Sequence, residues 1–495
     1  MPRLKPSNVI IIHPDLGIGG AERLILDAAL ALQARGHRVT IYTSHRDRNH
    51  CFEEARDGTL DVRVGGNTLF PAHVGGRLHV LMAVLRQLHL VGEVLGELAR
   101  RGGTTTTAGE KKEEEEDDIF IVDQVPACVP VLKILGPRYA SQRSKSKKSK
   151  RQRILFYCHF PDQLLARRDE GNTLLRLAKS LYRFPFDWFE GWAMSASDKV
   201  VANSKFTRGV VSDVFGQGRL GDVRVIYPCV DTKATGGKVV EDEAIIGDNL
   251  WGGKKILLSI NRFERKKDMG LAIRAYHGLG EEGRKGTRLV IAGGYDTRIP
   301  ENVHYHRDLE ALATSLGLST ATSKTVISAL SIPDSIDVLF LLSVPTAFKQ
   351  TLLSNSHLLL YTPINEHFGI VPVEAMHAGL PVLASNTGGP LETIVEGETG
   401  WLRDAHDVGA WTDVMRKVLF EMDQSERERM AAKARERVER EFSLAAMGDR
   451  LEEEIVDMLG KPRRPFTLGL QELLVGVLVS GIAVSVLVAV VLRGL

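Results

Sequence analysis

The first 44 residues limit the fold most strongly, because a short apolar run, a glycine-rich turn, an amphipathic helix and a second apolar run follow one another directly. Residues 8–14, NVIIIHP, are typical of a buried strand, and the turn GIGG follows at 17–20. A helical pattern then runs to Gly36, and RVTIYTS at 38–44 predicts a second strand. This order predicts a doubly wound α/β domain with a parallel sheet.

The same alternation continues and predicts a second domain of the same kind. A chain of 495 residues is too long for one ordinary core. We therefore expect an α/β chain with two Rossmann-like, doubly wound domains, at 1–235 and 236–460, and a ligand in the crevice at the carboxyl ends of their strands. The further expected strands are 118–124, 153–159, 199–204, 254–263, 287–296, 336–343, 356–363 and 380–386, and a long charged helix is expected over roughly 407–441.

Two polar insertions interrupt the first domain. Residues 101–118, RGGTTTTAGEKKEEEEDD, and 141–153, SQRSKSKKSKRQR, lack large apolar side chains, so we expect them to be solvated and mobile. The basic segment fits either an ordinary surface loop or a contact with anionic lipid. The net charge of +2 gives no basis for binding nucleic acid. Four scattered cysteines without a C-x-x-C pair argue against a zinc site or a disulfide framework.

The C-terminal segment 473–492, LLVGVLVSGIAVSVLVAVVL, contains no charged residue. Twenty such residues rise about 30 Å as a helix, which is enough to cross a bilayer. Lys461, Arg463 and Arg464 precede the segment and only Arg493 follows it. The positive-inside bias therefore predicts a tail anchor with residues 1–465 in the cytosol. The apolar run near the N-terminus is too short for a secretory signal.

Two other stretches fit either a protein core or a lipid surface. Residues 182–192, YRFPFDWFEGW, are dense in aromatic side chains, which suit core packing or a lipid headgroup interface. Residues 78–95 form an apolar helix interrupted by Arg86 and Glu93, which is too polar to span a membrane comfortably. A buried helix and an interfacial helix that guides a lipid are both open here.

The glycine turn at 17–20 is a weak indication of a ligand site by itself. Small residues let backbone N–H groups and a helix start approach a phosphate or a sugar. A dehydrogenase would require G-x-G-x-x-G and an acid about twenty residues later. The chain has G-x-G-G-A-E, and Asp47 lies too far along.

Stronger indications lie in the second domain. NRFERKKD at 261–268 follows a strand directly, and its basic groups either neutralise a diphosphate or form a solvated loop. In NEHFGIVPVE at 365–374, a strand ends, Gly369 allows a tight turn, and a helix begins with free N–H groups that would face an anion. Glu374, one turn into that helix, would accept hydrogen bonds from a ribose diol, and Glu366 would face a sugar.

A second strand, glycine turn and helix start follow at 385–394, SNTGGPLETI. Two helix starts and a basic loop in one domain together predict a site for a nucleoside diphosphate.

Five motifs are spread over both predicted domains: GGAER, CHFPD, NRFERKK, EHFGIVPVEAMHAGLPVLASNTGGPLE and EGETGWL. With them, the chain resembles the retaining GT-B glycosyltransferases of the large glycogen-synthase-like family over residues 8–460. Mannosyltransferases of the dolichol pathway are the most similar group. The two polar insertions depart from the family pattern.

The resemblance implies a role for each matching residue. Arg262 and Lys267 would hold the donor diphosphate, Glu374 the ribose, and Glu366 the transferred hexose. The catalytic residues implied are Glu366, Lys267, Arg262 and His159. The donor-binding residues implied are Gly19, Gly20, Arg262, Lys267, Glu366, Phe368, Gly369, Ile370 and Glu374.

The resemblance also implies the substrates and the setting. The donor would be GDP-mannose, and the acceptor a Man-GlcNAc2 unit on dolichyl diphosphate, which receives an α-1,3- and then an α-1,6-linked mannose for N-glycosylation. No metal or other cofactor is expected. The protein would lie on the endoplasmic reticulum membrane with its catalytic domains on the cytosolic face, in the company of other dolichol-pathway mannosyltransferases and without nucleic acid.

Several alternatives stay open on the sequence. The reaction would proceed by same-face attack, in which the leaving phosphate takes the acceptor proton, or by double displacement with Glu366 as the nucleophile. Another membrane-associated GT-B enzyme, such as a different dolichol-pathway mannosyltransferase or a phosphatidylinositol GlcNAc transferase, remains possible. A non-catalytic membrane scaffold would be favoured only if Glu366, Glu374, Arg262 or Lys267 were missing.

Overall fold

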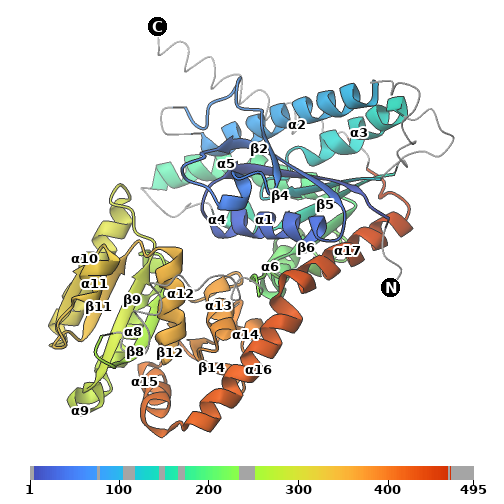
Figure 1. The fold of residues 1–495 in the computed structure, drawn as a ribbon. Helices are drawn as coiled ribbons and strands as arrows, with labels where there is room; N and C mark the ends of the chain where they lie inside the picture. Colours follow the sequence, from blue (N-terminus) through green and yellow to red (C-terminus); the bar gives the residue numbers. More distant parts are fainter. Residues whose placement is uncertain are drawn as a thin grey trace. The chain divides into compact units, whose positions relative to one another are not determined.

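The computed structural model describes residues 5–74, 78–103, 117–143, 151–165, 173–232, 251–466 and 469. The chain forms two compact units (Figure 1). The N-terminal unit comprises residues 1–227 and 447–495, and the C-terminal unit comprises residues 228–446.

Within the described residues, the N-terminal unit is built on a seven-stranded parallel sheet. Its strands are β1 (Asn8–Leu16), β2 (Arg38–Arg46), β3 (Asp61–Val64), β4 (Asp118–Asp123), β5 (Gln152–Cys158), β6 (Lys199–Ala202) and β7 (Arg224–Val225). Their spatial order is β3-β2-β1-β4-β5-β6-β7. The central strands β4 and β5 are buried along their whole length, as expected for strands covered on both faces.

The helices of this unit cover both faces of its sheet. They are α1 (Gly20–Gln33), η1 (Glu53–Ala55), α2 (His79–Gly103), α3 (Val129–Arg143), α4 (Asp162–Leu165), α5 (Thr173–Ser195), α6 (Lys205–Phe215) and α17 (Leu444–Gly460). Figure 1 shows α2 and α3 on one face and α1 on the other. Alternate residues of β1, Ile10 and Ile12, join Leu90 and Val94 of α2 in one apolar cluster.

The C-terminal unit repeats this design. Its strands are β8 (Lys255–Ile260), β9 (Thr287–Gly293), β10 (Thr320–Ser323), β11 (Val338–Leu342), β12 (Leu358–Tyr361), β13 (Val382–Ser385) and β14 (Gly400–Arg403). They form a seven-stranded sheet of order β10-β11-β9-β8-β12-β13-β14, and the strand pairs of this sheet are parallel. Its helices are η3 (Arg265–Lys267), α8 (Met269–His277), α9 (Gly280–Arg284), α10 (Pro300–Ser315), α11 (Val326–Leu330), α12 (Thr346–Asn355), α13 (Ile370–Ala378), α14 (Pro390–Thr393), α15 (Val408–Arg416), η4 (Lys417–Glu421) and α16 (Gln424–Phe442).

All ten strands expected from the sequence are confirmed, and the structure adds short strands that were not expected. These are β3, β10 and β14, of four residues each, and β7, of two. Each contains polar or charged side chains, and β3, β7 and β10 are only partly buried at sheet edges. Such strands lack the continuous apolar run that identifies a buried strand.

The prediction of one continuous helix over 407–441 is wrong. The structure has α15, a π-helical turn in η4, and then α16 from Gln424. Asp423 causes the new start, because its side chain accepts a hydrogen bond from the Glu426 N–H at 2.7 Å and so caps α16.

The ends of both polar insertions are regular structure rather than loops. α2 continues to Gly103 and α3 to Arg143, while β4 begins at Asp118 and β5 at Gln152. The remaining parts of the insertions, 104–116 and 144–150, lie outside the described residues.

The C-terminal end of the second domain differs from the prediction. The expected second domain ran to residue 460, whereas the structure assigns residues from Met447 onward to the N-terminal unit. There, Arg153 of β5 donates hydrogen bonds to the carbonyls of Met458 and Lys461 at 2.8 Å each. The expected boundary at 235 lies outside the described residues.

Membrane-related expectations are tested only in part. In the described portion of the chain, no helix is long and apolar enough to cross a membrane. The expected anchor at 473–492 lies outside that portion. The segment 78–95 falls in α2, and one face of this helix packs into the core of the N-terminal unit. Arg86 of the same helix forms an ion pair with Asp15 at 3.0 Å.

The four cysteines are free and buried.

Candidate functional site

In the C-terminal unit, the strand order reverses between β8 and β12. The chain proceeds from β8 to β9 on one side, whereas β12 pairs with β8 on the other. The loops that leave the carboxyl ends of β8 and β12 are therefore neighbours, and doubly wound sheets bind ligands at such a reversal. A hydrogen bond of 2.6 Å from Thr362 Oγ1 to the Lys267 carbonyl joins the two loops.

An ion pair between Lys267 and Glu366 lies at this junction. Lys267 Nζ donates a hydrogen bond to Glu366 Oε2, and the two side chains are 15% and 20% exposed. Burial opposes ionisation of Glu366, but the Lys267 charge and hydrogen bonds from Lys267 and Tyr361 outweigh it and hold the pKa of Glu366 below its ordinary value. Burial and the Glu366 charge raise the pKa of Tyr361 well above its usual value, so its hydroxyl stays a donor. Glu366 is thus an ionised, firmly held carboxylate at neutral pH.

Two glycines allow the next loop to close against Glu366. A Cβ on Gly389 would lie 2.1 Å from the Phe368 carbonyl oxygen, and a Cβ on Gly388 would lie 2.5 Å from that of Glu366. The Gly389 N–H donates to the Glu366 carbonyl at 2.7 Å. The sequence suggested that this second glycine turn opens another anion site. In the structure this turn supports the first loop, and the helix that follows it, α14, has only four residues. The second anion site stays a prediction.

The nine-residue helix α13 starts at Ile370 directly after Gly369, which has φ +82° and ψ +84°. No side chain caps this start, so the first N–H groups and the positive end of the helix dipole are available to an anion. Phe368 is 4% exposed and packs edge-to-face on Phe442, with 5.7 Å between ring centroids. Only the backbone of Phe368 is therefore suited to face a ligand.

Glu374 lies one turn into α13 and has a partner that the sequence did not reveal. Lys349 Nζ of α12 donates to Glu374 Oε1 at 2.6 Å. The other oxygen, Oε2, is buried and has no hydrogen-bond partner among the described residues. A buried hydrogen-bond acceptor without a donor is energetically unfavourable. This oxygen can therefore accept a hydrogen bond from a ligand hydroxyl.

Arg262 follows β8 and is exposed. No ion-pair partner is found for it within the described part of the chain, which leaves its guanidinium open to an anion. The structure therefore brings Lys267, Glu366, Phe368, Gly369, Ile370 and Glu374 together around one helix start and places Arg262 at the end of the adjacent strand.

The remaining predicted residues belong to the N-terminal unit, where the strand order reverses between β1 and β4. Gly19 precedes α1 and Gly20 is its first residue. A Cβ on Gly19 would lie 2.3 Å from Glu22 Oε2, so a carboxylate already lies over this helix start. Gly20 has open space around it.

His159 belongs to a cluster at the ends of β1, β4 and β5. Asp123 Oδ2 lies 2.8 Å from His159 Nε2, and Asp123 Oδ1 lies 2.8 Å from His13 Nδ1. Burial opposes charge on both His13 and Asp123, but their mutual attraction prevails, raising the pKa of His13 and lowering that of Asp123. The carboxylate thus orients both imidazoles.

Sequence reasoning missed His13, Asp123 and Lys349. For the first two a signal existed, because each stands at the carboxyl end of a predicted central strand. Lys349 lies within an ordinary amphipathic helix and offered no such signal.

Within the described ranges, no group of three or more His, Cys, Asp or Glu residues is arranged to hold a metal ion. The expectation that the reaction needs no metal stays a prediction.

Comparison with protein-family models gives two matches. Residues 241–437 match the model described as "Glycosyl transferases group 1", and residues 136–234 match "Glycosyltransferase Family 4". Among solved structures, the sucrose-phosphate synthase from Thermosynechococcus elongatus aligns with a TM-score of 0.63 at 18% identity, over 92% of this chain and 99% of that one. WaaG, a glycosyltransferase of lipopolysaccharide biosynthesis, aligns with a TM-score of 0.55 at 19% identity, over 90% and 99%. At these identities the structures bear on the fold alone.

Similarity in sequence is much higher among fungal proteins. The alpha-1,3/1,6-mannosyltransferase alg-2 of Neurospora crassa is 47% identical over 481 residues, which cover 96% of each chain. The alpha-1,3/1,6-mannosyltransferase alg2 of Schizosaccharomyces pombe is 41% identical over 460 residues, covering 91% of this chain and 81% of its own. At this identity and coverage, the chain is a glycosyltransferase and belongs to the alpha-1,3/1,6-mannosyltransferase ALG2 family.

Proposed function

We propose that the chain transfers mannose from GDP-mannose to a Man-GlcNAc2 unit on dolichyl diphosphate, forming first an α-1,3 and then an α-1,6 linkage. The observation that carries this proposal is the partly buried Lys267–Glu366 pair beside the uncapped start of α13. Membership of the α-1,3/1,6-mannosyltransferase family supports the choice of sugar and acceptor.

The C-terminal unit would bind the donor. The diphosphate would lie at the first N–H groups of α13, with Arg262 and Lys267 adding positive charge. The ribose hydroxyls would donate to Glu374 Oε2, which has no partner in the described residues, while Lys349 holds Oε1. Glu366 would accept hydrogen bonds from the hexose.

The chemical step follows from this charge distribution. The bond between the anomeric carbon and the diphosphate oxygen breaks, and the acceptor hydroxyl forms its bond to that carbon on the same face. The hydroxyl proton passes to the leaving phosphate oxygen. Lys267 and Arg262 would stabilise the negative charge that develops on the diphosphate, which is a transition-state effect.

A double displacement through Glu366 is the alternative mechanism. It requires the Glu366 carboxylate to leave its hydrogen bonds with Lys267 and Tyr361 and attack the anomeric carbon. The firm hold on both sides of this carboxylate favours same-face attack.

The acceptor side and the setting are also part of this proposal. The N-terminal unit would supply His159, oriented by Asp123, as a further catalytic residue. The enzyme would work without a metal, on the cytosolic face of the endoplasmic reticulum membrane, beside other mannosyltransferases of the same pathway.

The test is mannose transfer by the full-length protein in detergent. GDP-mannose and a Man-GlcNAc2-diphosphate lipid should give products with one and then two added mannoses, with or without EDTA. Transfer from another sugar nucleotide in place of GDP-mannose would contradict the donor assignment. Loss of activity in EDTA that added metal restores would contradict the metal-free mechanism.

A further inference from the structure

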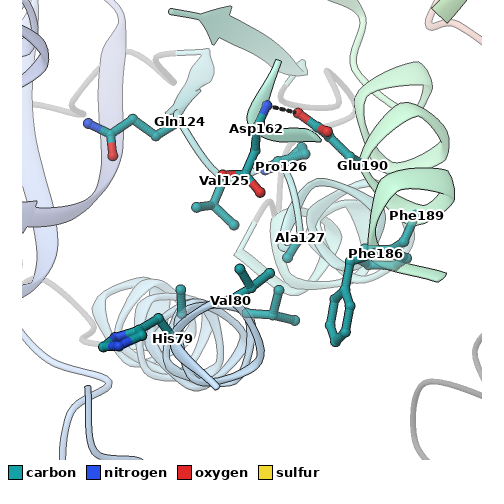
Figure 2. A pocket seen from close by; sticks show the side chains of 12 residues that line it. His79, Val80, Gln124, Val125, Pro126, Ala127, Asp162, Phe186, Phe189 and Glu190 are labelled. Atoms are coloured by element: carbon teal, nitrogen blue, oxygen red, sulfur yellow. Dashed lines mark hydrogen bonds between the residues drawn. The ribbon is translucent and has the colours of Figure 1, made fainter. Parts of the chain in front are cut away.

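An apolar cavity of about 220 Å³ lies within the N-terminal unit, and none of the predicted site residues lines it (Figure 2). Val80 and Ala83 of α2 form one wall, and Phe186 of α5 forms another. Figure 2 shows the Phe186 ring beside this space, with Val125 and Ala127 of the loop after β4 facing it from across.

The cavity wall continues directly from the histidine–aspartate cluster. Gln124 and Val125, which line the cavity, follow Asp123 in the chain, and Asp162, also in the wall, comes three residues after His159. A ligand part held in the cavity would therefore lie close to Asp123 and His159.

The charges around the cavity favour an uncharged occupant. The acidic groups in its wall are already bonded: the Glu190 carboxylate accepts the backbone N–H groups of Asp162 and Gln163 at 2.7 and 3.2 Å, and Asp162 pairs with Arg183 at 2.7 Å. No lysine or arginine is among the described residues that line the cavity. The cavity therefore has no cation that would bind a diphosphate, whereas its apolar wall suits an apolar chain.

The surroundings extend this apolar character outward. Leu164 and Leu165 of α4 and Phe184 of α5 have exposed fractions of 52%, 56% and 67%. Exposed apolar side chains on α4 and α5, two helices that pack against each other, suit a contact with lipid or protein. The cavity is smaller than the roughly 300–1,000 Å³ typical of sites that enclose a whole small ligand, so it suits one segment of a longer molecule.

We propose that this cavity binds the first isoprene units of the lipid-linked acceptor, next to its diphosphate. The inference rests on the proposed function, and it assigns the lipid part of the acceptor to a defined site formed by α2, α5 and the loop after β4. The exposed side chains of α4 and α5 would meet the chain where it leaves the cavity.

Filling the cavity tests the proposal. Ala83→Trp places a large ring in it, and Gly92→Trp is the matched control, because Gly92 lies on the same helix, is exposed, and has open space around its Cβ position. With a dolichyl-linked acceptor, Ala83→Trp should raise the acceptor KM about tenfold or more, as expected for the loss of two or more buried methylene contacts. The KM for GDP-mannose and the kinetics of Gly92→Trp should stay unchanged.

The chain-length dependence separates a lipid site from a general defect. With an acceptor that carries only an ethyl group on its diphosphate, Ala83→Trp and the unmodified protein should have the same acceptor KM. An equal rise in acceptor KM with both acceptors, or no rise with the dolichyl acceptor, would overturn the proposal.

Photo-crosslinking makes the test independent of mannose transfer and of the variants. Farnesyl diphosphate that carries a benzophenone on its terminal isoprene should label peptides of α2 or α5 in the full-length protein, and excess unlabelled farnesyl diphosphate should prevent this. Labelling elsewhere, or competition by dodecyl phosphate equal to that by farnesyl diphosphate, would overturn the isoprenoid assignment. If labelling occurs but no sugar nucleotide supports transfer, the proposed function fails while the lipid site stands.

Discussion

Lys267 and Lys266 are adjacent in the chain but differ in their environment, which makes them a matched pair. Lys267 is 15% exposed and bonded to Glu366, whereas Lys266 is 74% exposed and pairs with Glu264 at 3.1 Å. We expect Lys267→Met to lower kcat by about 10²–10³, the usual cost of removing one donor that stabilises a developing anion.

The measurement is steady-state transfer from GDP-mannose by both variants. Lys266→Met should retain nearly full activity, because exposed ion pairs contribute little. Similar losses in the two variants would mean that the basic loop acts through its net charge and not through the Lys267–Glu366 contact.

Glu190 should make the N-terminal unit less stable as the pH rises toward neutral. Burial raises the pKa of Glu190 from 4.5 to about 7, against the opposing effect of backbone N–H groups such as that of Asp162. Between these two values the folded state keeps a proton that the unfolded state releases. The free energy of unfolding therefore falls by about 3 kcal/mol as the pH rises from 4.5 to 7.

Denaturant unfolding of the unmodified protein and of Glu190→Gln at several pH values measures this effect. The difference between the two should change by about 3 kcal/mol over that range, since the glutamine side chain cannot titrate. Glu53→Gln, at an exposed position of the same unit, is the control and should follow the unmodified protein. A constant difference between Glu190→Gln and the unmodified protein would contradict the raised pKa.

At the scale of elements, the proposed donor site includes the contact between the loops after β12 and β13. Gly389→Ala would place a Cβ 2.1 Å from the Phe368 carbonyl oxygen and force these loops apart. Overpacking of this kind costs about 1–3 kcal/mol, so we expect the KM for GDP-mannose to rise about tenfold.

Gly409→Ala is the control for that substitution. Its Cβ would meet Asp407 Oδ1 at 3.4 Å, an ordinary contact at the start of α15. Donor titration by fluorescence or calorimetry compares the two variants, and unchanged affinity in Gly389→Ala would show that the loop contact does not form the donor site.

At the scale of the whole molecule, the N-terminal unit needs a segment that lies more than 200 residues further along the chain. Leu451 and Ile455 of α17 are fully buried, and Lys199 pairs with Glu454 at 2.7 Å. A chain that ends at residue 446 should therefore lose several kcal/mol in this unit, at about 1.5–3 kcal/mol for each buried apolar side chain. Since domains have only about 5–15 kcal/mol in total, such a chain should be far more sensitive to protease.

A chain that ends at residue 466 is the control, because it keeps α17 and the Arg153 contacts with Met458 and Lys461. Limited proteolysis followed by mass spectrometry compares the two chains. Equal resistance of residues 5–232 in both would contradict a role for α17 in this unit.

Sequence patterns predicted the elements whose own residues contain the information. The central strands, such as β1 and β8, are continuous apolar runs, and the family motifs identified the residues around α13. Edge strands such as β3 were missed because such a strand is partly exposed to solvent and reads as polar. The break before α16 was missed because a cap is a single residue, Asp423, within a strongly helical stretch.

By itself, the sequence determined the two α/β sheets and the family, and it pointed to the residues proposed for the donor, because strand periodicity and local motifs are encoded in neighbouring residues. Only the tertiary structure decided which distant side chains meet. It paired Lys349 with Glu374, brought His13 and Asp123 to His159, placed α17 in the N-terminal unit, and left the apolar cavity beside α2. Contacts of this kind depend on the order of strands in a sheet and on the packing of helices across it, which no local pattern specifies.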